Sequence, residues 1–243
     1  MLINLDKEFK KYNIFPKGFI QVGAHIGQEV KIFKKLNSEA KIYLFEPQKE
    51  LFQKLKIQYK NDKYITLFNL ALGDSKQTQT MFKDTNNDSQ SSSILKPKEH
   101  LKYHSYIEFE KDNQEVIYVD TLDSFNIHDI NILCIDVQGY ELNVLKGSIN
   151  SLNNVEALVV EINRKELYEG CPHVSEIDNF LKDFDYVRIV TKWWKKTIPW
   201  GDALYIKKNK ITLMKLVITT LANFINQKNI TFYILSKVTS FKK

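Results

Sequence analysis

Residues 19–27 read Phe-Ile-Gln-Val-Gly-Ala-His-Ile-Gly, an apolar strand that runs directly into a glycine-containing turn. Residues 28–36 then place apolar side chains at helical spacing, which predicts a helix after the turn. In open α/β sheets the crevice outside the carboxyl ends of the strands is the usual ligand site. Glycine suits such a turn because a side chain there would occupy ligand space. The stretch predicts a ligand-binding turn or an ordinary strand–helix connection, and other residues are needed to distinguish the two.

Strand-like and helix-like segments alternate over most of the chain. Short apolar runs predict strands at residues 19–22, 42–45, 64–68, 132–137, 157–162, 186–190 and 203–206. Amphipathic spacing predicts helices at residues 28–36, 51–59, 142–146 and 177–181. Such alternation indicates a parallel sheet with helices on both faces. The last two strands have no helix between them, so they should form a hairpin that puts an antiparallel strand into the sheet.

The length of 243 residues fits one α/β domain and a short appendage. We predict a domain over residues 1–207, with its core at 18–207, and an amphipathic helical appendage over 208–243. The appendage is basic, so it could dock on the domain, contact another subunit of a homo-oligomer, or make a peripheral contact with a membrane surface. Residues 73–100 are polar and predict a long loop, which in compact domains is usually functional or mobile.

The composition is that of an ordinary globular protein, with 43% hydrophobic and 26% charged residues. The net charge of +6 suits anionic partners, or it reflects scattered lysines on a solvated surface. The two cysteines, Cys134 and Cys171, have neither metal-binding nor disulfide spacing, which favours a cytoplasmic location. Residues 1–16 do not read as a signal peptide, and no apolar run is long enough to span a bilayer.

A carboxylate follows the second predicted strand, in the sequence Phe45-Glu46-Pro47. Glu46 could accept hydrogen bonds from both hydroxyls of a ribose. It follows Gly23 at about the 20-residue separation expected of a ribose-binding acid. The turn lacks the third glycine of the dinucleotide pattern, which argues against an NAD-dependent dehydrogenase. An adenosine-containing ligand without a required pyrophosphate, such as S-adenosylmethionine, fits both the turn and the acid.

With these residues in place, the chain resembles the FkbM family of methyltransferases over about residues 18–207. The segments that carry the resemblance are Gln21–Glu29, Leu44–Pro47, Asn69–Asp74, Val119–Phe125, and Ile135–Glu141 with Val144–Gly147. Residues 161–163 and the serines at 91–93 match more weakly. Many relatives carry aspartate at the position of Gln21 and glutamate at the position of Gln138. The second departure weakens any mechanism that requires a base at that position.

The resemblance implies a Rossmann-like class I methyltransferase fold, with a mostly parallel seven-stranded sheet and an antiparallel last strand. It implies S-adenosylmethionine as the donor and O-methylation, commonly of hydroxyls on sugars or natural products, so that the acceptor is a small molecule or a glycan. A catalytically inactive binding module and an RNA methyltransferase remain alternatives. No clustered array of arginines and aromatic residues is present, since the only arginines are Arg164 and Arg188, so nucleic acid is not the expected partner.

Asp136 is the first candidate for a catalytic base, because it ends the central predicted strand and should emerge beside the glycine turn. Burial there would raise its pKa toward useful values. Alternatively, Asp136 caps the following helix or holds the amino group of the cofactor. Glu161 ends the fifth strand and could assist. His25 is a further catalytic candidate, or a turn residue that packs over the ligand.

The expected cofactor contacts follow the strand ends and the polar loop: Gly23, Ala24, His25, Gly27, Glu46, Pro47, Asn69, Ser92 and Asp136. Asn69 could read an adenine edge or satisfy turn backbone. Asp136 and Glu161 could jointly hold a divalent cation, but a third ligand is not evident and we predict no metal site. An aromatic wall near the last hairpin suits stacking on a sugar, core packing or a subunit interface; it comprises Trp193, Trp194 and Trp200.

Overall fold

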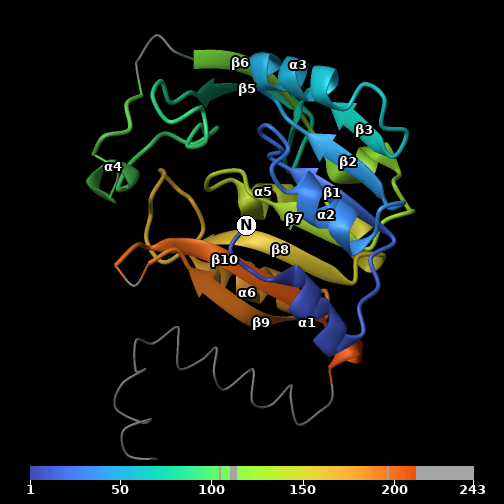
Figure 1. The fold of residues 1–243 in the computed structure, drawn as a ribbon. Coiled ribbons are helices and arrows are strands. Elements are labelled where there is room, and N and C mark those ends of the chain that lie inside the picture. The colour runs from blue at the N-terminus through green and yellow to red at the C-terminus, as the bar shows by residue number, and fades with distance from the viewer. Residues whose placement is uncertain (104, 110–113, 196, 212–243) are drawn as a thin grey trace, which may run out of the picture.

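A seven-stranded sheet forms the centre of the computed structural model, which describes residues 1–103, 105–109, 114–195 and 197–211. The strands lie in the order β3-β2-β1-β7-β8-β10-β9. Their bounds are β1 Gly18–Val22, β2 Lys41–Phe45, β3 Ile65–Phe68, β7 Ile132–Ile135, β8 Ala157–Asn163, β9 Tyr186–Trp193 and β10 Trp200–Lys207. Only β10 is antiparallel to its neighbours, β8 and β9 (Figure 1). The predicted Rossmann-like class I fold with an antiparallel last strand is confirmed.

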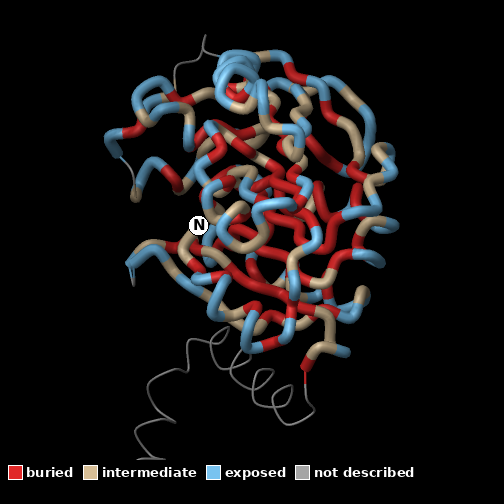
Figure 2. The backbone as a smooth tube through the Cα atoms, turned by 45° about the vertical axis from the view of Figure 1, so that its right-hand side comes forward, coloured by how far each residue is buried: buried red, intermediate tan, exposed pale blue. Residues whose placement is uncertain are grey.

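Helices cover both faces of the sheet, as predicted. Their bounds are α1 Leu5–Tyr12, α2 Val30–Leu36, α3 Lys49–Gln58, α4 His100–Tyr103, α5 Glu141–Lys146 and α6 Val174–Lys182, with short 3₁₀ turns at Leu122–Phe125, Ser151–Asn153 and Lys208–Lys210. Successive residues of β7 alternate between two apolar clusters. Leu133 and Ile135 face α5 and α6, whereas Ile132 and Cys134 face α1, α2 and α3. The central strands are therefore buried throughout, as Figure 2 shows.

The N-terminal helix α1 is an element that the sequence analysis did not predict. The Asn4 side chain caps it by accepting a hydrogen bond from the backbone N–H of Lys7. Leu5, Phe9 and Tyr12 are spaced along one face and are buried against the sheet. Charged residues between them leave a single apolar stripe on a helix of only eight residues. This docking brings the chain N-terminus close to the carboxyl edge of the sheet (Figure 1).

A second, three-stranded sheet corrects the expectation that residues 73–100 form one long loop. Its strands, in the order β4-β6-β5, are β4 Ala71–Leu72, β6 Gln114–Asp120 and β5 Gln77–Phe82. Strand β5 pairs antiparallel with β6, and only one face of the pair is covered. The outer side chains Val116 and Tyr118 are more than 70% exposed. A half-solvated strand of mainly polar residues gives a weak apolar signal, which explains why the sequence analysis missed β5.

The C-terminal segment of the described chain ends in the short turn Lys208–Lys210, after which Ile211 packs into the core. The rest of the predicted appendage, residues 212–243, lies outside the described residues, so the division into a domain and an appendage stays a prediction. Among the described residues no helix is both long and apolar enough to cross a membrane. Cys134 and Cys171 are free thiols, and both are buried.

Candidate active site

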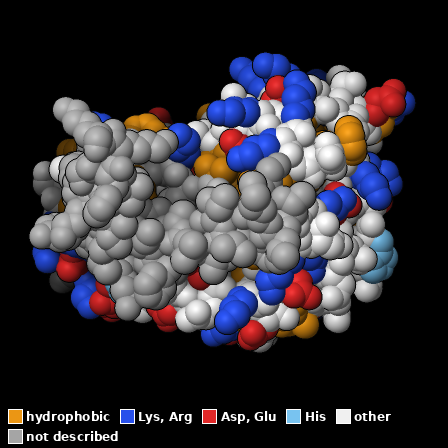
Figure 3. Space-filling view, turned by 90° about the horizontal axis from the view of Figure 1, so that it is seen from below, with side chains coloured by type: hydrophobic (Ala, Val, Ile, Leu, Met, Phe, Trp, Pro, Cys, Tyr) orange, Lys and Arg blue, Asp and Glu red, His pale blue; other side chains and the backbone are white. Residues whose placement is uncertain are grey.

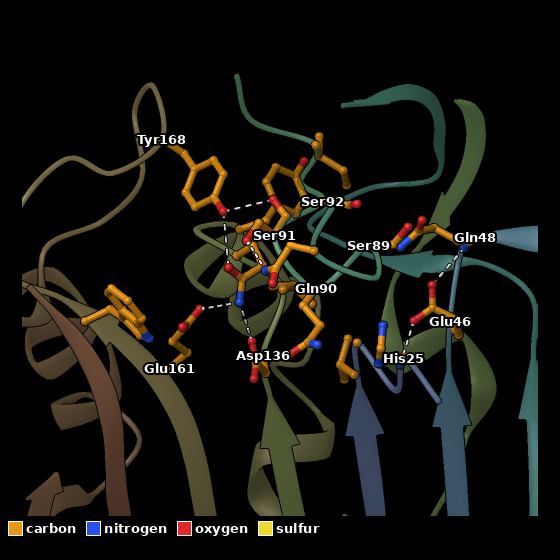
Figure 4. A pocket seen from close by; sticks show the side chains of 18 of the residues that line it. His25, Glu46, Gln48, Ser89, Gln90, Ser91, Ser92, Asp136, Glu161 and Tyr168 are labelled. Atoms are coloured by element: carbon orange, nitrogen blue, oxygen red, sulfur yellow. Dashed lines mark hydrogen bonds between the residues drawn. The ribbon is translucent and has the colours of Figure 1, made fainter. Parts of the chain in front are cut away.

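A cleft of about 490 Å³ opens at the carboxyl ends of β1, β2, β7 and β8 and at the start of β10. This volume is within the range of small-molecule sites. Asn87, Ser89–Ser92, Ile94 and His100 line it from the side opposite the strand ends. In Figure 4, Glu46 and Gln48 lie at one end of the cleft, Glu161 and Tyr168 at the other, and Asp136 between them. The crevice is where open α/β sheets usually bind ligands.

Glu46 is fixed by backbone hydrogen bonds directly after β2. Its Oε2 accepts from the N–H of His25 at 2.8 Å and its Oε1 from the N–H of Gln48 at 2.9 Å. The residue is 3% exposed, and this burial raises its pKa to about 7 against the lowering effect of the two N–H groups. A carboxylate offers about four lone-pair positions. Each oxygen of Glu46 therefore keeps the capacity to accept a ligand hydroxyl.

Gln48 adds an acceptor beside Glu46. Its side chain lines the cleft and is 3% exposed, and its Oε1 has no hydrogen-bond partner among the described residues. A buried polar atom is normally paired, because leaving it unpaired costs about 1–3 kcal/mol. The Glu46–Gln48 end of the cleft thus fits a ligand with neighbouring hydroxyls, as a ribose has.

The close approach of neighbouring chain segments leaves no room for a side chain at the two glycines of the turn. Gly23 has φ +76°, and a Cβ atom there would lie 1.9 Å from the backbone oxygen of Asp136. Gly27 also has φ +76°, and its Cβ would lie 2.7 Å from the Tyr59 hydroxyl on the far side of the turn. We expected ligand space to demand these glycines. The ends of β1 and β7 approach each other closely, and the turn packs closely against Tyr59. These contacts require glycine at both positions independently of any ligand.

His25 is held by hydrogen bonds to both of its ring nitrogens. Nε2 lies 2.6 Å from the backbone oxygen of Asp88, and Nδ1 lies 2.9 Å from Nε2 of Gln28. A carbonyl only accepts, so Nε2 carries the hydrogen and Nδ1 accepts from the glutamine. The imidazole thereby ties the turn to the segment over the cleft, and neither nitrogen is left for proton abstraction.

Gln138 joins the two carboxylates at the other end of the cleft. Its Nε2 donates to Oδ1 of Asp136 at 2.8 Å and to Oε2 of Glu161 at 3.0 Å. Its Oε1 lies 3.1 Å from the hydroxyl of Tyr168. The amide thus uses both of its N–H groups to hold Asp136 and Glu161 a fixed distance apart (Figure 4).

The backbone at Gln138 is strained in a way that supports this bridge. Gln138 has φ +55° and Gly139 has φ +99°. Ser93 Oγ donates to the carbonyl of Gln138 at 2.7 Å, and Glu141 Oε1 accepts from the N–H of Gly139 at 2.9 Å. Left-handed conformations at non-glycine residues persist where surrounding contacts enforce them, often at functional sites. The loop after β7 is therefore built to aim Gln138 into the cleft.

The carboxylates at this end differ in protonation. Asp136 faces the open cleft from its floor, and desolvation by the surrounding protein raises its pKa to about 6. Glu161 is 7% exposed, and burial together with Asp136 raises its pKa well above the ordinary value. Near neutral pH, Asp136 is mostly ionised, and the raised pKa of Glu161 favours the protonated form of that carboxyl. Neighbouring groups with separated pKa values are a common arrangement for acid–base chemistry.

Glu141 holds the loop from below and does not line the cleft. It is fully buried, and its Oε1 accepts from the N–H groups of Val137 and Gly139 at 3.2 and 2.9 Å. Burial raises its pKa to about 7. Glu141 therefore has a structural role in holding the loop after β7.

Comparison with known proteins places this chain in a family. The methyltransferase FkbM domain matches residues 21–188. The chain belongs to the FkbM methyltransferase family. It is 25% identical over 178 residues to the 2-O-methyltransferase NoeI of Sinorhizobium fredii, covering 69% of this chain and 72% of NoeI. The family and the enzyme class expected from the sequence, an S-adenosylmethionine-dependent methyltransferase, are confirmed.

One solved structure agrees with the fold. Methyltransferase FkbM from Methylobacillus flagellatus KT has a TM-score of 0.53 and 16% identity, covering 78% of this chain. This chain corresponds to only 43% of the length of the Methylobacillus flagellatus protein. An rRNA methylase from Streptococcus thermophilus has a TM-score of 0.48 and 11% identity, covering 85% of this chain and 96% of that one.

The predicted cofactor residues of this FkbM methyltransferase divide into two groups. Those that line the cleft are Gly23, His25, Glu46, Pro47, Ser92 and Asp136, together with the catalytic candidate Glu161. Ala24 and Gly27 are buried within the turn and do not line the cleft. The Asn69 amide donates to the carbonyls of Glu46 and Pro47, each at 3.0 Å, so it fastens the turn after β2 and does not reach the cleft lining.

The serine segment is tied down by hydrogen bonds. Asp84 accepts from the N–H groups of Asn87, Ser89 and Ser91, and Ser92 Oγ accepts from the N–H of Asp84 at 3.2 Å. Ser92 is 4% exposed. These bonds hold the segment as a fixed cover over the cleft.

Two further expectations concern metals and tryptophans. In the part of the chain that the structure describes, no group of three or more His, Cys, Asp or Glu side chains is placed to hold a metal ion. The position between Asp136 and Glu161 holds the Gln138 amide nitrogen. Trp194 and Trp200 line the cleft, whereas Trp193 packs on the core and lies over Arg164, 3.7 Å from ring centre to guanidinium carbon.

Several cleft residues escaped the sequence analysis as site residues. Gln48, Asn163 and Asp202 line the cleft, and Gln138 was noted only as a departure from the family pattern. Gln48 and Asn163 follow strand ends, which is a signal that could have indicated them. Asp202 lies just before the predicted strand at 203–206, and its place in the cleft depends on how β10 pairs with β8.

Proposed function

We propose that this FkbM methyltransferase uses S-adenosylmethionine to methylate a hydroxyl oxygen of a small-molecule acceptor of the sugar or natural-product class. The observation that carries the donor assignment is Glu46, a buried carboxylate with remaining acceptor capacity, next to the unpaired Oε1 of Gln48. Ribose hydroxyls would satisfy both groups. The relative NoeI, a 2-O-methyltransferase, supports oxygen as the methylated atom.

When bound, S-adenosylmethionine supplies an electrophilic methyl group on a sulfonium. The chain has to align the acceptor hydroxyl and remove its proton. Oδ1 of Asp136 is engaged by Gln138, so Oδ2 is the oxygen that takes the proton. Asp136 would take the hydroxyl proton as the acceptor oxygen displaces the methyl group from the donor sulfur, so that the O–H and S–C bonds break, the O–C bond forms, and S-adenosylhomocysteine is left as a neutral thioether. A pKa of about 6 leaves Asp136 ionised at neutral pH while keeping useful basicity.

Glu161 has a different part in this proposal. Burial and the neighbouring Asp136 raise the pKa of Glu161 well above its ordinary value, and in this proposal Glu161 acts in the protonated form that this shift favours. A protonated carboxyl can donate a hydrogen bond, so Glu161 would orient the acceptor oxygen. The bridging Gln138 keeps the two side chains in register.

An RNA acceptor fits the cleft less well. The lining includes five acidic residues, Glu29, Glu46, Asp136, Glu161 and Asp202, and among the described lining residues none is lysine or arginine. RNA recognition requires cationic contacts to phosphates. On the visible part of the face in Figure 3, basic and acidic side chains are interspersed.

Calorimetry on the full chain with S-adenosylmethionine, S-adenosylhomocysteine and NAD tests the donor. We expect the first two to bind and NAD not to bind. Binding of NAD in place of S-adenosylmethionine would refute the assignment. Transfer of a labelled methyl group to a panel of sugars and hydroxylated natural products then tests the acceptor class. Binding of the donor with turnover only on RNA would overturn the acceptor part alone.

A further inference from the structure

Four side chains from β8 and β10 form a patch at one end of the cleft. In the antiparallel pairing, Asp202 lies opposite Glu161 and Trp200 lies opposite Asn163. Directly opposed residues, and residues two apart on one strand, share a face of the sheet. Glu161, Asn163, Trp200 and Asp202 all line the cleft, next to the proposed base Asp136. We call these four residues the β8–β10 patch.

The β8–β10 patch contains features that a structural role does not explain. Asn163 is 2% exposed, and its Oδ1 accepts no hydrogen bond from the described residues. Glu161 and Asp202 are two carboxyl groups directly opposed across strands, a pairing that would destabilise the sheet if both were ionised. Such local violations are expected mainly at functional sites. An unpaired buried acceptor beside two carboxyl groups indicates a ligand that donates hydrogen bonds.

From this juxtaposition we propose that the β8–β10 patch is the acceptor subsite and binds a sugar ring that carries no phosphate or carboxylate. The proposal rests on the proposed function and specifies its substrate. One face of the ring would lie on the indole of Trp200, which packs on its other side against the cluster of Leu167, Tyr168 and Cys171. Hydroxyl or amino groups of the ring would donate to Asn163 and Asp202, and the reacting hydroxyl would lie at Oδ2 of Asp136, the oxygen that Gln138 does not engage.

The acidic side chains of the cleft determine which charge a bound ring can carry. A phosphate or carboxylate at the β8–β10 patch would approach Asp202 and would also face Asp136 and Glu29. Like charges in a partly buried site repel strongly because the effective dielectric constant is low. The same carboxylates would attract a cationic group on the ring. Asp202 also accepts a hydrogen bond from the N–H of Leu2. An amino sugar should therefore bind at least as well as its neutral counterpart.

Saturation-transfer NMR on the full chain with S-adenosylhomocysteine tests the subsite without requiring turnover. The probes are gluco-, galacto- and manno-configured pyranosides, each as the neutral sugar, the 2-amino sugar, the 6-phosphate and the 6-carboxylate. We expect neutral and amino forms of at least one configuration to bind, and the anionic forms of that configuration to bind weakly or not at all. Equal or tighter binding of an anionic form would overturn the proposal, as would binding of no ring at all.

Variants assign the binding to the β8–β10 patch. Trp200→Leu should weaken ring binding about fivefold, whereas Trp200→Phe, which keeps a ring, should retain most of it. Asp202→Asn should weaken the amino form more than the neutral form. Asp183→Asn, at an exposed carboxylate after α6, is the matched control and should change nothing. Unchanged binding in both Trp200→Leu and Asp202→Asn would sink the assignment.

The test separates this proposal from the proposed function. Calorimetry with S-adenosylmethionine is run on every variant, together with a thermal melt, so that loss of folding or of donor binding is detected. If the wild-type chain does not bind S-adenosylmethionine, the proposed function fails. If the donor binds and labelled methyl reaches another hydroxylated compound while no ring binds the β8–β10 patch, only the subsite proposal fails.

Discussion

The side-chain nitrogen of Gln138 lies 2.8 Å from Oδ1 of Asp136 and donates a hydrogen bond to it. This bond favours the ionised carboxylate and so lowers its pKa, while desolvation raises it. The pKa of about 6 is the balance of these opposing effects. Gln138 is therefore a positioning residue that also adjusts the proposed base.

Gln138→Asn tests this relationship. Asparagine tolerates a left-handed backbone but is one methylene shorter, so it cannot bridge Asp136 and Glu161. Loss of the hydrogen bond should raise the pKa of Asp136, and the acidic limb of the pH–rate profile should move to higher pH. The profile is measured by labelled methyl transfer at saturating donor. A uniform loss of rate without movement of the limb would indicate a purely structural role.

Asp136→Asn removes the proposed base without changing the size of the side chain. The rate of methyl transfer should fall by about 10²–10⁴-fold, with donor affinity changed little. Asp129→Asn is the matched control, because Asp129 precedes β7 and pairs with Lys41 and Tyr43 away from the cleft. Single-turnover transfer measures the rate. A loss smaller than about threefold would assign Asp136 a binding role instead.

Glu46→Gln tests the ribose contact. The amide loses the charge and one acceptor oxygen, so affinity for S-adenosylmethionine should fall about 10- to 100-fold. Calorimetry measures the affinity, and Glu50→Gln on the exposed surface of α3 serves as the control. Thermal melts of both ligand-free variants check folding. If a folded Glu46→Gln variant bound the donor like the wild type, Glu46 would have no part in recognition.

Gly23→Ala and Gly170→Ala separate two costs of glycine replacement. Both positions have positive φ, +76° and +73°, but an added Cβ at Gly23 would collide with Asp136 O whereas one at Gly170 meets nothing within 4 Å. Gly170→Ala should cost about 1 kcal/mol of unfolding free energy, from backbone conformation alone. Gly23→Ala should cost about 3 kcal/mol or more. Denaturant unfolding measures both, and equal costs would contradict the steric reason.

Glu141→Gln tests how the buried carboxyl affects stability against pH. The folded-state pKa is raised from 4.5 to about 7. Between these values the folded chain binds more protons than the unfolded chain, so the unfolding free energy falls as pH rises. The variant keeps an acceptor for the N–H groups of Val137 and Gly139 but cannot titrate. Its melting temperature should therefore fall less than that of the wild type between pH 5 and pH 8, and an identical pH dependence would refute the raised pKa.

The sequence predicted the parts of this molecule that follow from continuous apolar runs. Buried parallel strands have apolar residues on both faces, so β1, β2, β7 and β8 were recognised and their carboxyl ends located Gly23, Glu46 and Asp136. The half-exposed strands β5 and β6 and the short helix α1 lack such runs. Which side chains of these short or half-exposed elements are buried becomes clear only when the segment that packs against them is known.

Contacts between residues on different strands could not be predicted from the sequence. The β8–β10 patch depends on the register that places Asp202 opposite Glu161, which no motif encodes. The bridge from Gln138 depends on a left-handed residue where glycine is more usual. Asn69 sits at a strand end like Glu46, yet its amide turns to backbone carbonyls. Side-chain direction at a strand end is set by tertiary contacts, so position in the chain alone did not distinguish these cases.

The insertion of β10 between β8 and β9 has a consequence for how the molecule is made. During synthesis, β9 emerges before β10, but it has no sheet neighbour to pair with until residues 200–207 follow. The donor end of the cleft can be complete while the acceptor end still lacks Trp200 and Asp202. A released chain that ended at residue 195 would therefore carry β9 without its sheet neighbour, and the unpaired edges of that strand would be exposed to premature association.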